Sequence, residues 1–155
     1  MASVEFSLSE FYSAFADLQA GLRNAAHQAL KSAVDDAYDS AKTTALFKDG
    51  PKANLRGSIE KGIPEALEGF IKAGGRKAPY GRYVEDGTVP HDIVAKKGGM
   101  LRFVSGGTTF FRRRVRHKGT TARPFMAVAG KVGEQSLDYG LDYYAESPIA
   151  YFNRG

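Results

Sequence analysis

The chain has 155 residues, of which 43% are apolar and 25% are charged, proportions that are typical of a soluble globular protein. It has no cysteine, which excludes disulfide bonds, thiolate metal sites and a thiol nucleophile. No stretch reaches the ~20 apolar residues that span a bilayer, so we expect no membrane partner. The net charge is +5, but residues 50–132 carry 17 Lys and Arg against 6 Asp and Glu, whereas both ends are acidic.

The N-terminal region predicts a long helix. Ser7 and Glu10 have the spacing of a capping box, in which each side chain satisfies a free backbone amide of the first turn. An apolar stripe follows at spacings of three and four residues: Leu8, Phe11, Phe15, Leu18, Leu22, Ala25 and Ala29, continued by Ala33 and Ala37. We expect a helix over residues 8–46, stopped at residues 49–51 by Asp-Gly-Pro. At ~57 Å it would exceed the needs of a small domain, so it either breaks near Gly21 or projects toward neighbouring subunits.

The region of residues 55–118 is predicted to be rich in β-structure. The expected elements are a short segment at Leu55–Ile59, strands at Ala66–Lys72, His91–Lys96, Met100–Ser105 and Thr108–His117, and a short helix at Ala78–Val84. Glycine pairs separate the last three strands at hairpin spacing, which predicts antiparallel pairing.

The C-terminal region predicts a second helix. Pro124 suits its first turn, and we expect it over residues 124–144, followed by an apolar tail at 145–155 that docks on the rest of the protein. The aromatic residues near this end are candidates for contacts between subunits: Tyr143, Tyr144, Tyr151 and Phe152. The predicted fold class is α+β, in a single domain over residues 1–155, with a long N-terminal helix, a small antiparallel sheet and a C-terminal helix.

The segment from Tyr80 to Thr88, with the sequence Tyr-Gly-Arg-Tyr-Val-Glu-Asp-Gly-Thr, resembles a motif of a bacteriophage protein family. The family is the tail-completion proteins of long-tailed double-stranded DNA phages, also called head–tail joining or minor tail proteins. It typically carries aromatic–x–x–aromatic–Val/Leu–Glu–x–Gly–Thr. The residues that carry the resemblance are Tyr80, Tyr83, Glu85, Gly87 and Thr88.

Three further segments follow the order found in this family. They are Leu55–Ile59, similar to its L-x-x-S-I element; Leu101–Phe103 with Thr109–Val115, similar to its central hairpin; and Gly119–Ala129, which includes Pro124 and Phe125 and is similar to its entry into the last helix. The four segments together lie within roughly residues 45–130. The chain departs from the pattern at Val128, where the family often has a proline, and in its apolar C-terminal tail.

The resemblance implies a structural virion protein without catalytic activity and without a cofactor. It implies an α+β subunit of a hexameric ring at the head-proximal end of the tail tube. The expected partners are other copies of the chain, the tail-tube or tail-terminator protein, the head-connector protein and, transiently, genomic double-stranded DNA. The protein would be made in the cytoplasm of the bacterial host and would reside in the neck of the virion.

Basic residues dominate the segment 110–118. On one continuous strand alternate side chains share a face, so Arg112, Arg114, Arg116 and Lys118 would form a basic row with a spacing of about 7 Å. This row could be a solvated face paired with acidic helices of the same or a neighbouring subunit, or the lining of a DNA channel, or a contact with the tail tube or connector. The uneven charge of the chain likewise allows the middle to face a polyanion, or the ends of one copy to meet the middle of another.

Other sequence features do not predict a catalytic or metal site. The three histidines fall on different predicted elements without a carboxylate at ligand spacing, and Asp35-Asp36 face different directions on a helix. There is no nucleophile elbow and no phosphate-binding glycine loop, and we expect Tyr80 and Tyr83 to pack under the sheet. The chain is therefore expected not to be an enzyme. The alternative to an assembly protein is a small basic protein that binds nucleic acid without sequence specificity.

Overall fold

The computed structural model describes residues 8–44 and 55–153, which form two compact units. The helical unit comprises the described residues up to Ala78 and from Phe125 onward, and the hairpin unit comprises Pro79–Pro124. The helices and the small antiparallel sheets confirm the predicted α+β class, with its long N-terminal helix and its C-terminal helix. The capping residue Ser7 and the predicted helix stop at residues 49–51 lie outside the described residues.

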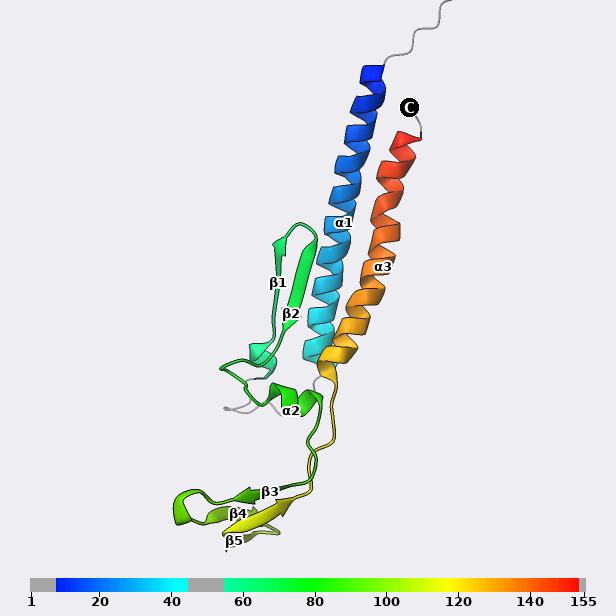
Figure 1. Ribbon diagram of the computed structural model, residues 1–155. Helices are drawn as coiled ribbons and strands as arrows, with labels where there is room; N and C mark the ends of the chain where they lie inside the picture. Colours follow the sequence, from blue (N-terminus) through cyan, green and yellow to red (C-terminus); the bar gives the residue numbers. More distant parts are fainter. Residues whose placement is uncertain (1–7, 45–54, 154–155) are drawn as a thin grey trace, which may run out of the picture. The chain divides into compact units, whose positions relative to one another are not determined.

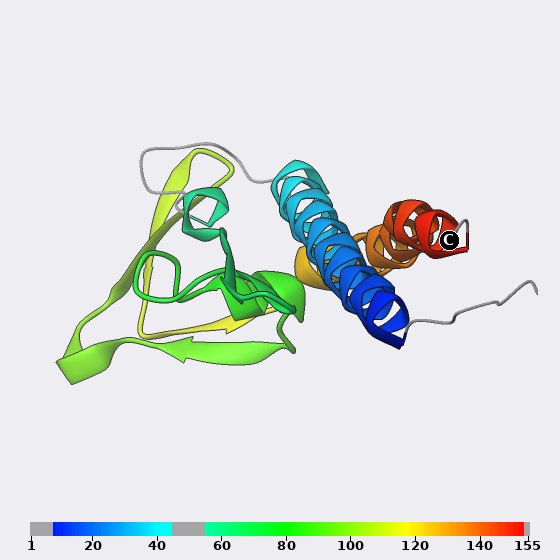
Figure 2. The same cartoon turned by 90° about the horizontal axis from the view of Figure 1, so that it is seen from above.

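In the helical unit, α1 (Leu8–Thr44) and α3 (Phe125–Phe152) lie side by side and run antiparallel (Figure 1). A hairpin of β1 (Glu60–Glu65) and β2 (Glu68–Lys72) lies against another side of α1, as the view from above shows (Figure 2). The short 3-10 helix η1 (Arg56–Ser58) leads into this hairpin. Helix α1 is therefore the central element, covered on one side by α3 and on another by the hairpin.

Small side chains line the contact between α1 and α3. The buried alanines of α1 recur along the predicted stripe: Ala25, Ala29, Ala33, Ala37 and Ala41. Glycines of α3 face them so closely that a Cβ at Gly140 would lie 3.0 Å from the Cα of Ala29. A Cβ at Gly133 would lie 3.3 Å from the carbonyl oxygen of Ala33. The alanine half of the stripe thus forms the helix contact, because only small residues allow so close an approach.

Helix α1 is unbroken over 37 residues, about 55 Å at ~1.5 Å per residue, so the alternative of a break near Gly21 is wrong. Gly21 is instead a contact point for α3, since a Cβ there would lie 2.8 Å from the Cβ of Pro148. Helix α3 also runs on to Phe152, so the prediction that it ends at residue 144 and gives way to a separate tail is wrong. Proline usually interrupts a helix, but α3 continues through Pro148, whose ring packs against Gly21 of α1.

Strand β1 is absent from the sequence prediction because it contains Gly62 and Pro64, residue types that rarely occur inside strands. It pairs antiparallel with β2, in the register of Lys61 opposite Ile71, and the ladder is irregular between Gly62 and Glu65. Strand β2 confirms the strand predicted over residues 66–72, although it begins two residues later.

The hairpin unit consists of short elements. They are α2 (Gly81–Glu85), the 3-10 helix η2 (Lys96–Gly98), β3 (His91–Val94), β4 (Leu101–Ser105), β5 (Thr108–Arg112) and β6 (Arg114–His117). Strand β3 pairs antiparallel with β6, and β4 pairs antiparallel with β5. The prediction of one strand over residues 108–117 is wrong, because the chain changes partner at Arg113. The carbonyl of Arg113 accepts a hydrogen bond from the amide of Ala95 at 2.9 Å, and no glycine or proline marks this division in the sequence.

Candidate functional site

The segments around Thr88 and Thr120 are joined side by side in the hairpin unit. Their backbones exchange two hydrogen bonds, with N–O distances of 3.0 and 3.1 Å, and their hydroxyl oxygens lie 3.1 Å apart. Next to them, the amide of Arg123 donates to the carbonyl of Val84 at 2.8 Å. We call this set of contacts the closing bridge. It brings together two of the family-like segments, and the chain enters and leaves the hairpin unit through it.

The closing bridge gives structural roles to several motif residues. Gly87 has a φ of +71°, a conformation that favours glycine, and a Cβ there would lie 2.6 Å from the carbonyl oxygen of Thr120. Thr88 supplies the bridge itself. Pro124 directly precedes α3, and Phe125, the first residue of this helix, is buried.

Tyr80 and Tyr83 line an open cleft of about 470 Å³ in the hairpin unit. Tyr83 is 61% exposed and Tyr80 38%, so the prediction that both pack under the sheet is wrong. Lys118 and Arg123 line the same cleft, and Glu85, at the end of α2, is half-buried. An open cleft with phenol rings and cationic groups can receive an aromatic or acidic side chain of a partner.

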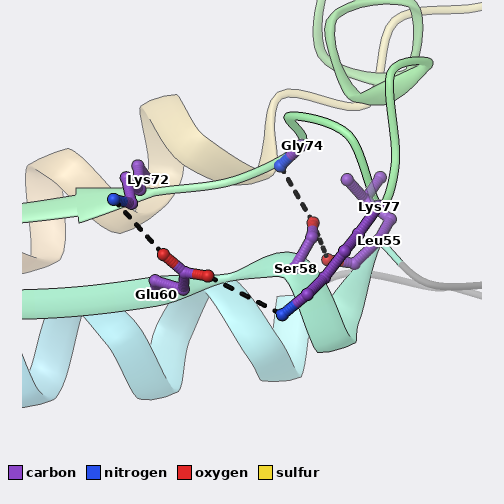
Figure 3. A network of polar contacts seen from close by, with 6 residues as sticks. All are labelled: Leu55, Ser58, Glu60, Lys72, Gly74 and Lys77. Carbon is purple, nitrogen blue, oxygen red and sulfur yellow. Dashed lines mark hydrogen bonds and ion pairs between the residues drawn. The ribbon is translucent and has the colours of Figure 1, made fainter.

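The L-x-x-S-I element belongs to the core of the helical unit, and Figure 3 shows the polar contacts that Ser58 and Glu60 make there. Leu55 and Ile59 are buried, and the buried hydroxyl of Ser58 donates to the carbonyl of Leu55 at 2.6 Å. The same oxygen accepts a hydrogen bond from the amide of Gly74 at 2.9 Å. Glu60 forms ion pairs with two lysines nearby, at 3.3 and 3.8 Å. Because its hydroxyl both donates and accepts a hydrogen bond, Ser58 connects η1 to the loop after β2, which is a structural role.

The basic residues of segment 110–118 do not form one row. Arg112 lies in β5, whereas Arg114 and Arg116 lie in β6, and the two strands pair with different neighbours, so the predicted continuous row is wrong. Arg114 and Arg116 do share an exposed face, as strand alternation predicts. Both reach the carboxylate of Asp92 in β3, with N–O distances of 2.5 and 3.9 Å. Their acidic partner is thus in the same two-stranded sheet and not on a helix.

The other cationic side chains of this segment differ in the contacts that they make. The guanidinium of Arg112 donates to the carbonyl of Phe111 at 3.0 Å and lies over the ring of Phe110, 5.8 Å from its centroid. Lys118 and Arg113 are exposed, and neither forms a hydrogen bond or an ion pair through its side chain with another described residue. On one continuous strand Arg113 would lie on the face opposite to Arg112 and Arg114. The division of the strand at this residue could not be predicted from the sequence.

Helix α3 carries a row of acidic residues that the sequence analysis did not identify. Its members recur at every fourth residue, on both sides of residue 144: Glu134, Asp138, Asp142 and Glu146. All four side chains are exposed, and none has a hydrogen bond or an ion pair with another residue in the described part of the chain. A spacing of four places them on one side of the helix.

The aromatic residues proposed for contacts between subunits all lie on α3. Tyr143, Tyr144 and Tyr151 are exposed and Phe152 is half-buried. Tyr139, which the sequence analysis missed, is 71% exposed, and its ring stacks on that of Tyr143 with 6.1 Å between the centroids. These rings are accessible, and their contact with another subunit stays a prediction.

Large apolar side chains are exposed at the start of α1. Leu8 is 72% exposed and Phe11 56%, and the rings of Phe11 and Phe15 stack at 6.3 Å. Further along, Leu22 of α1 and Leu141 of α3 line an open groove of about 900 Å³ between the two helices. The large residues of the predicted stripe therefore form a surface and not a core.

Two histidines that were expected on separate elements lie together. The rings of His91 and His117 face each other across β3 and β6, with 5.1 Å between their centroids. The Nδ1 of His117 accepts a hydrogen bond from the amide of Gly119 at 3.1 Å, which ties this ring to the backbone. Within residues 8–44 and 55–153, no group of three or more histidine and acidic side chains is placed to hold a metal ion.

Comparisons with protein-family models, with curated proteins and with solved structures find no match to this chain. None of the described helices is both long enough and apolar enough to cross a bilayer.

Proposed function

We propose that this chain is a structural, non-enzymatic protein of a tailed double-stranded DNA bacteriophage. It forms a ring, in the expected case a hexamer, that completes the tail, joins it to the head connector and leaves a channel for the genome. Its partners are other copies of itself, the tail-tube or tail-terminator protein and the connector protein, in the neck of the virion.

The observation that carries this proposal is the exposed apolar surface of α1 and α3. The first turns of α1 present Leu8, Phe11 and Phe15 to solvent, and α3 presents Tyr139 and a row of further aromatic residues. Large apolar side chains that gather on an exposed surface often mark contacts with other proteins, so these residues favour permanent contact with other proteins. A subunit that is built into a particle meets this requirement, whereas an enzyme that works alone does not.

Two further observations support the same proposal. The four family-like segments occur in the order of the tail-completion family, and the α+β class agrees with the fold that the resemblance implies. The charges are also segregated: the hairpin unit carries 10 Lys and Arg against 3 Asp and Glu, whereas α3 carries 1 against 4. Surfaces of opposite sign on one chain favour association between copies.

The test is a phage whose gene for this chain is inactivated. Cells infected with it should accumulate DNA-filled heads and separate tails, and the chain supplied from a plasmid should restore joined, infectious particles. Cryo-electron microscopy of the restored particles should reveal a ring of this fold between head and tail. Infectious particles of normal shape that lack the chain altogether would refute the proposal.

A second candidate function is nucleic-acid binding by the isolated protein, favoured by the exposed cations Arg113 and Lys118 in the hairpin unit. Such binding would be independent of sequence and would weaken steeply with salt. Replacing Arg113 and Lys118 by Ala should then strongly weaken the affinity for duplex DNA. Unaltered affinity would exclude these two residues as the binding surface.

A further inference from the structure

The exposed face of α3 is a surface with a defined chemistry. The stacked rings of Tyr139 and Tyr143 form one row along the helix, and Asp142 and Glu146 follow them at a spacing of three residues. Residues three apart are neighbours on a helix surface, so the aromatic row and the acidic row lie side by side. We call this surface the α3 face. It is aromatic on one side and negatively charged on the other.

The α3 face contains a hollow that suits an arginine side chain. Tyr143, Tyr144 and Glu146, with Ser147 and Ala150, line an open pocket of about 410 Å³. The two tyrosine rings stand nearly perpendicular to each other, with 5.1 Å between their centroids. A guanidinium stacks on aromatic rings and pairs with a carboxylate through a planar fork of donors, and this pocket supplies both kinds of group.

The charge of the α3 face is not neutralised within the described part of the chain. Its carboxylates are exposed, without an ion pair to another described residue, and successive members of the row are like-charged neighbours that repel each other. A cationic partner would remove this repulsion. The tyrosines would at the same time lose their contact with water, so an occupant with both cations and apolar area fits best.

The hairpin unit of a second copy has the matching chemistry. It holds an excess of seven positive charges, and its exposed strands carry apolar side chains such as Val94 and Phe111 between the cations. Arg114 and Arg116 are already paired with Asp92 and Arg112 lies on Phe110, whereas the side chain of Arg113 has no partner among the described residues.

We propose that the α3 face of one copy docks the hairpin unit of the next copy, and that Arg113 of that unit enters the pocket of Tyr143, Tyr144 and Glu146. This inference rests on the proposed ring and names the contact that closes it. The two surfaces differ, so each copy uses its α3 face toward one neighbour and its hairpin unit toward the other. A head-to-tail contact of this type generates a ring when the rotation closes.

Charge reversal tests the contact. One variant carries Asp142→Lys and Glu146→Lys, a second carries Arg113→Glu and Lys118→Glu, and a third carries all four substitutions. Each of the first two should weaken self-association by about tenfold or more in sedimentation velocity at low salt, and the third should regain most of it. Substitutions that merely harmed folding would not be rescued by combination, and circular dichroism of each variant checks the helix content. Loss in the first two without recovery in the third would overturn the proposed contact.

Crosslinking tests the geometry, because the chain has no cysteine of its own. A copy with Ser147→Cys, on the rim of the pocket, is mixed with a copy with Val94→Cys, which lies opposite Arg114 in the β3–β6 ladder. A short thiol crosslinker should join the two copies in a 1:1 product, both at high protein concentration and in assembled particles. The matched control, Gln28→Cys on the exposed surface of α1 mixed with Val94→Cys, should give no product.

The outcomes separate this inference from the proposed function. Particles that contain a ring of the chain but give no crosslink between positions 147 and 94 would overturn the contact and leave the ring standing. A crosslink within one chain that carries both cysteines, at dilutions where copies do not meet, would overturn docking between copies. Absence of the chain from every particle would overturn the ring itself.

Discussion

Gly21 of α1 faces Pro148 of α3 so closely that a Cβ at position 21 would lie 2.8 Å from the Cβ of the proline. A proline ring cannot rotate away, so Gly21→Ala must push the helices apart. Overpacking of this kind typically destabilises by about 1–3 kcal/mol, more than the ~1 kcal/mol that alanine gains over glycine in a helix. We therefore expect Gly21→Ala to lower the stability of the helical unit in urea unfolding followed by circular dichroism.

The matched control is Gly130→Ala in α3. A Cβ there meets nothing within 4 Å, so only the helix preference acts and the variant should be more stable than the parent by about 0.5–1 kcal/mol. Equal effects of the two substitutions would show that Gly21 does not set the distance between the helices.

The same pair of residues shows what sequence patterns can and cannot predict. The spacing of the apolar residues predicted α1 and its buried alanines, because helix periodicity is a local property. It could not predict that the ring of Pro148 packs against Gly21, because these two residues lie more than a hundred positions apart in the sequence. The acidic row could have been found from the sequence, because Glu134, Asp138 and Asp142 recur at a spacing of four within the predicted helix and only Glu146 lies beyond its predicted end. Division of the strand at Arg113 depends on the pairing of β6 with distant β3, which no local pattern encodes.

The closing bridge makes Gly87 hard to replace. Gly87→Ala meets both an unfavourable positive φ and a collision with the backbone of Thr120. The φ alone accounts for about 1–2 kcal/mol, and the collision adds to it. We expect the amides of residues 84–88 and 119–123 to exchange their hydrogens with solvent much faster in this variant, measured by hydrogen exchange and mass spectrometry.

Gly107→Ala isolates the effect of the backbone conformation. This glycine also has a positive φ, +81°, but a Cβ there meets nothing within 4 Å. Exchange at the closing bridge should stay as in the parent, and only the turn between β4 and β5 should loosen. If Gly107→Ala opened the bridge as much as Gly87→Ala does, the role assigned to the collision would be wrong.

An ion pair between Lys61 and Asp35 joins β1 to α1, with 2.6 Å between Nζ and Oδ1. The hydrogen bond to Asp35 raises the pKa of Lys61 above its ordinary value of 10.5. A raised lysine pKa contributes stability that is fully present below the pKa of the unfolded chain and is lost as the pH rises through the pKa of the folded one. Asp35→Asn should therefore lower stability by about 0.2–1 kcal/mol at pH 8, and this difference should be smaller at about pH 11, because the lysine loses its proton as the pH rises through its raised pKa.

Urea unfolding of the parent and the variant at both pH values measures this difference. Asp36→Asn is the control, because Asp36 accepts a hydrogen bond from Ser136 at 2.5 Å and involves no lysine. Its effect should be the same at pH 8 and pH 11. A loss in Asp35→Asn that persists undiminished at the higher pH would show that the protonated lysine is not its cause.

Asp92 forms ion pairs with Arg114 and Arg116 on the exposed face of the β3–β6 ladder. Whether this face contacts DNA or another protein can be tested by removing the carboxylate. If phosphates approach it, Asp92→Asn removes a competing carboxylate and frees two guanidinium groups. The affinity for duplex DNA should then rise several-fold at low salt, and the plot of log K against log salt should become steeper by about one or two charges. Asp86→Asn provides the control: it changes the net charge equally but frees only Arg82, on α2. A rise confined to Asp92→Asn would place the phosphates on the β3–β6 face. An equal rise in both variants would mean that only net charge matters. If the affinity rose in neither variant, Arg114 and Arg116 would be expected to contact protein and not DNA.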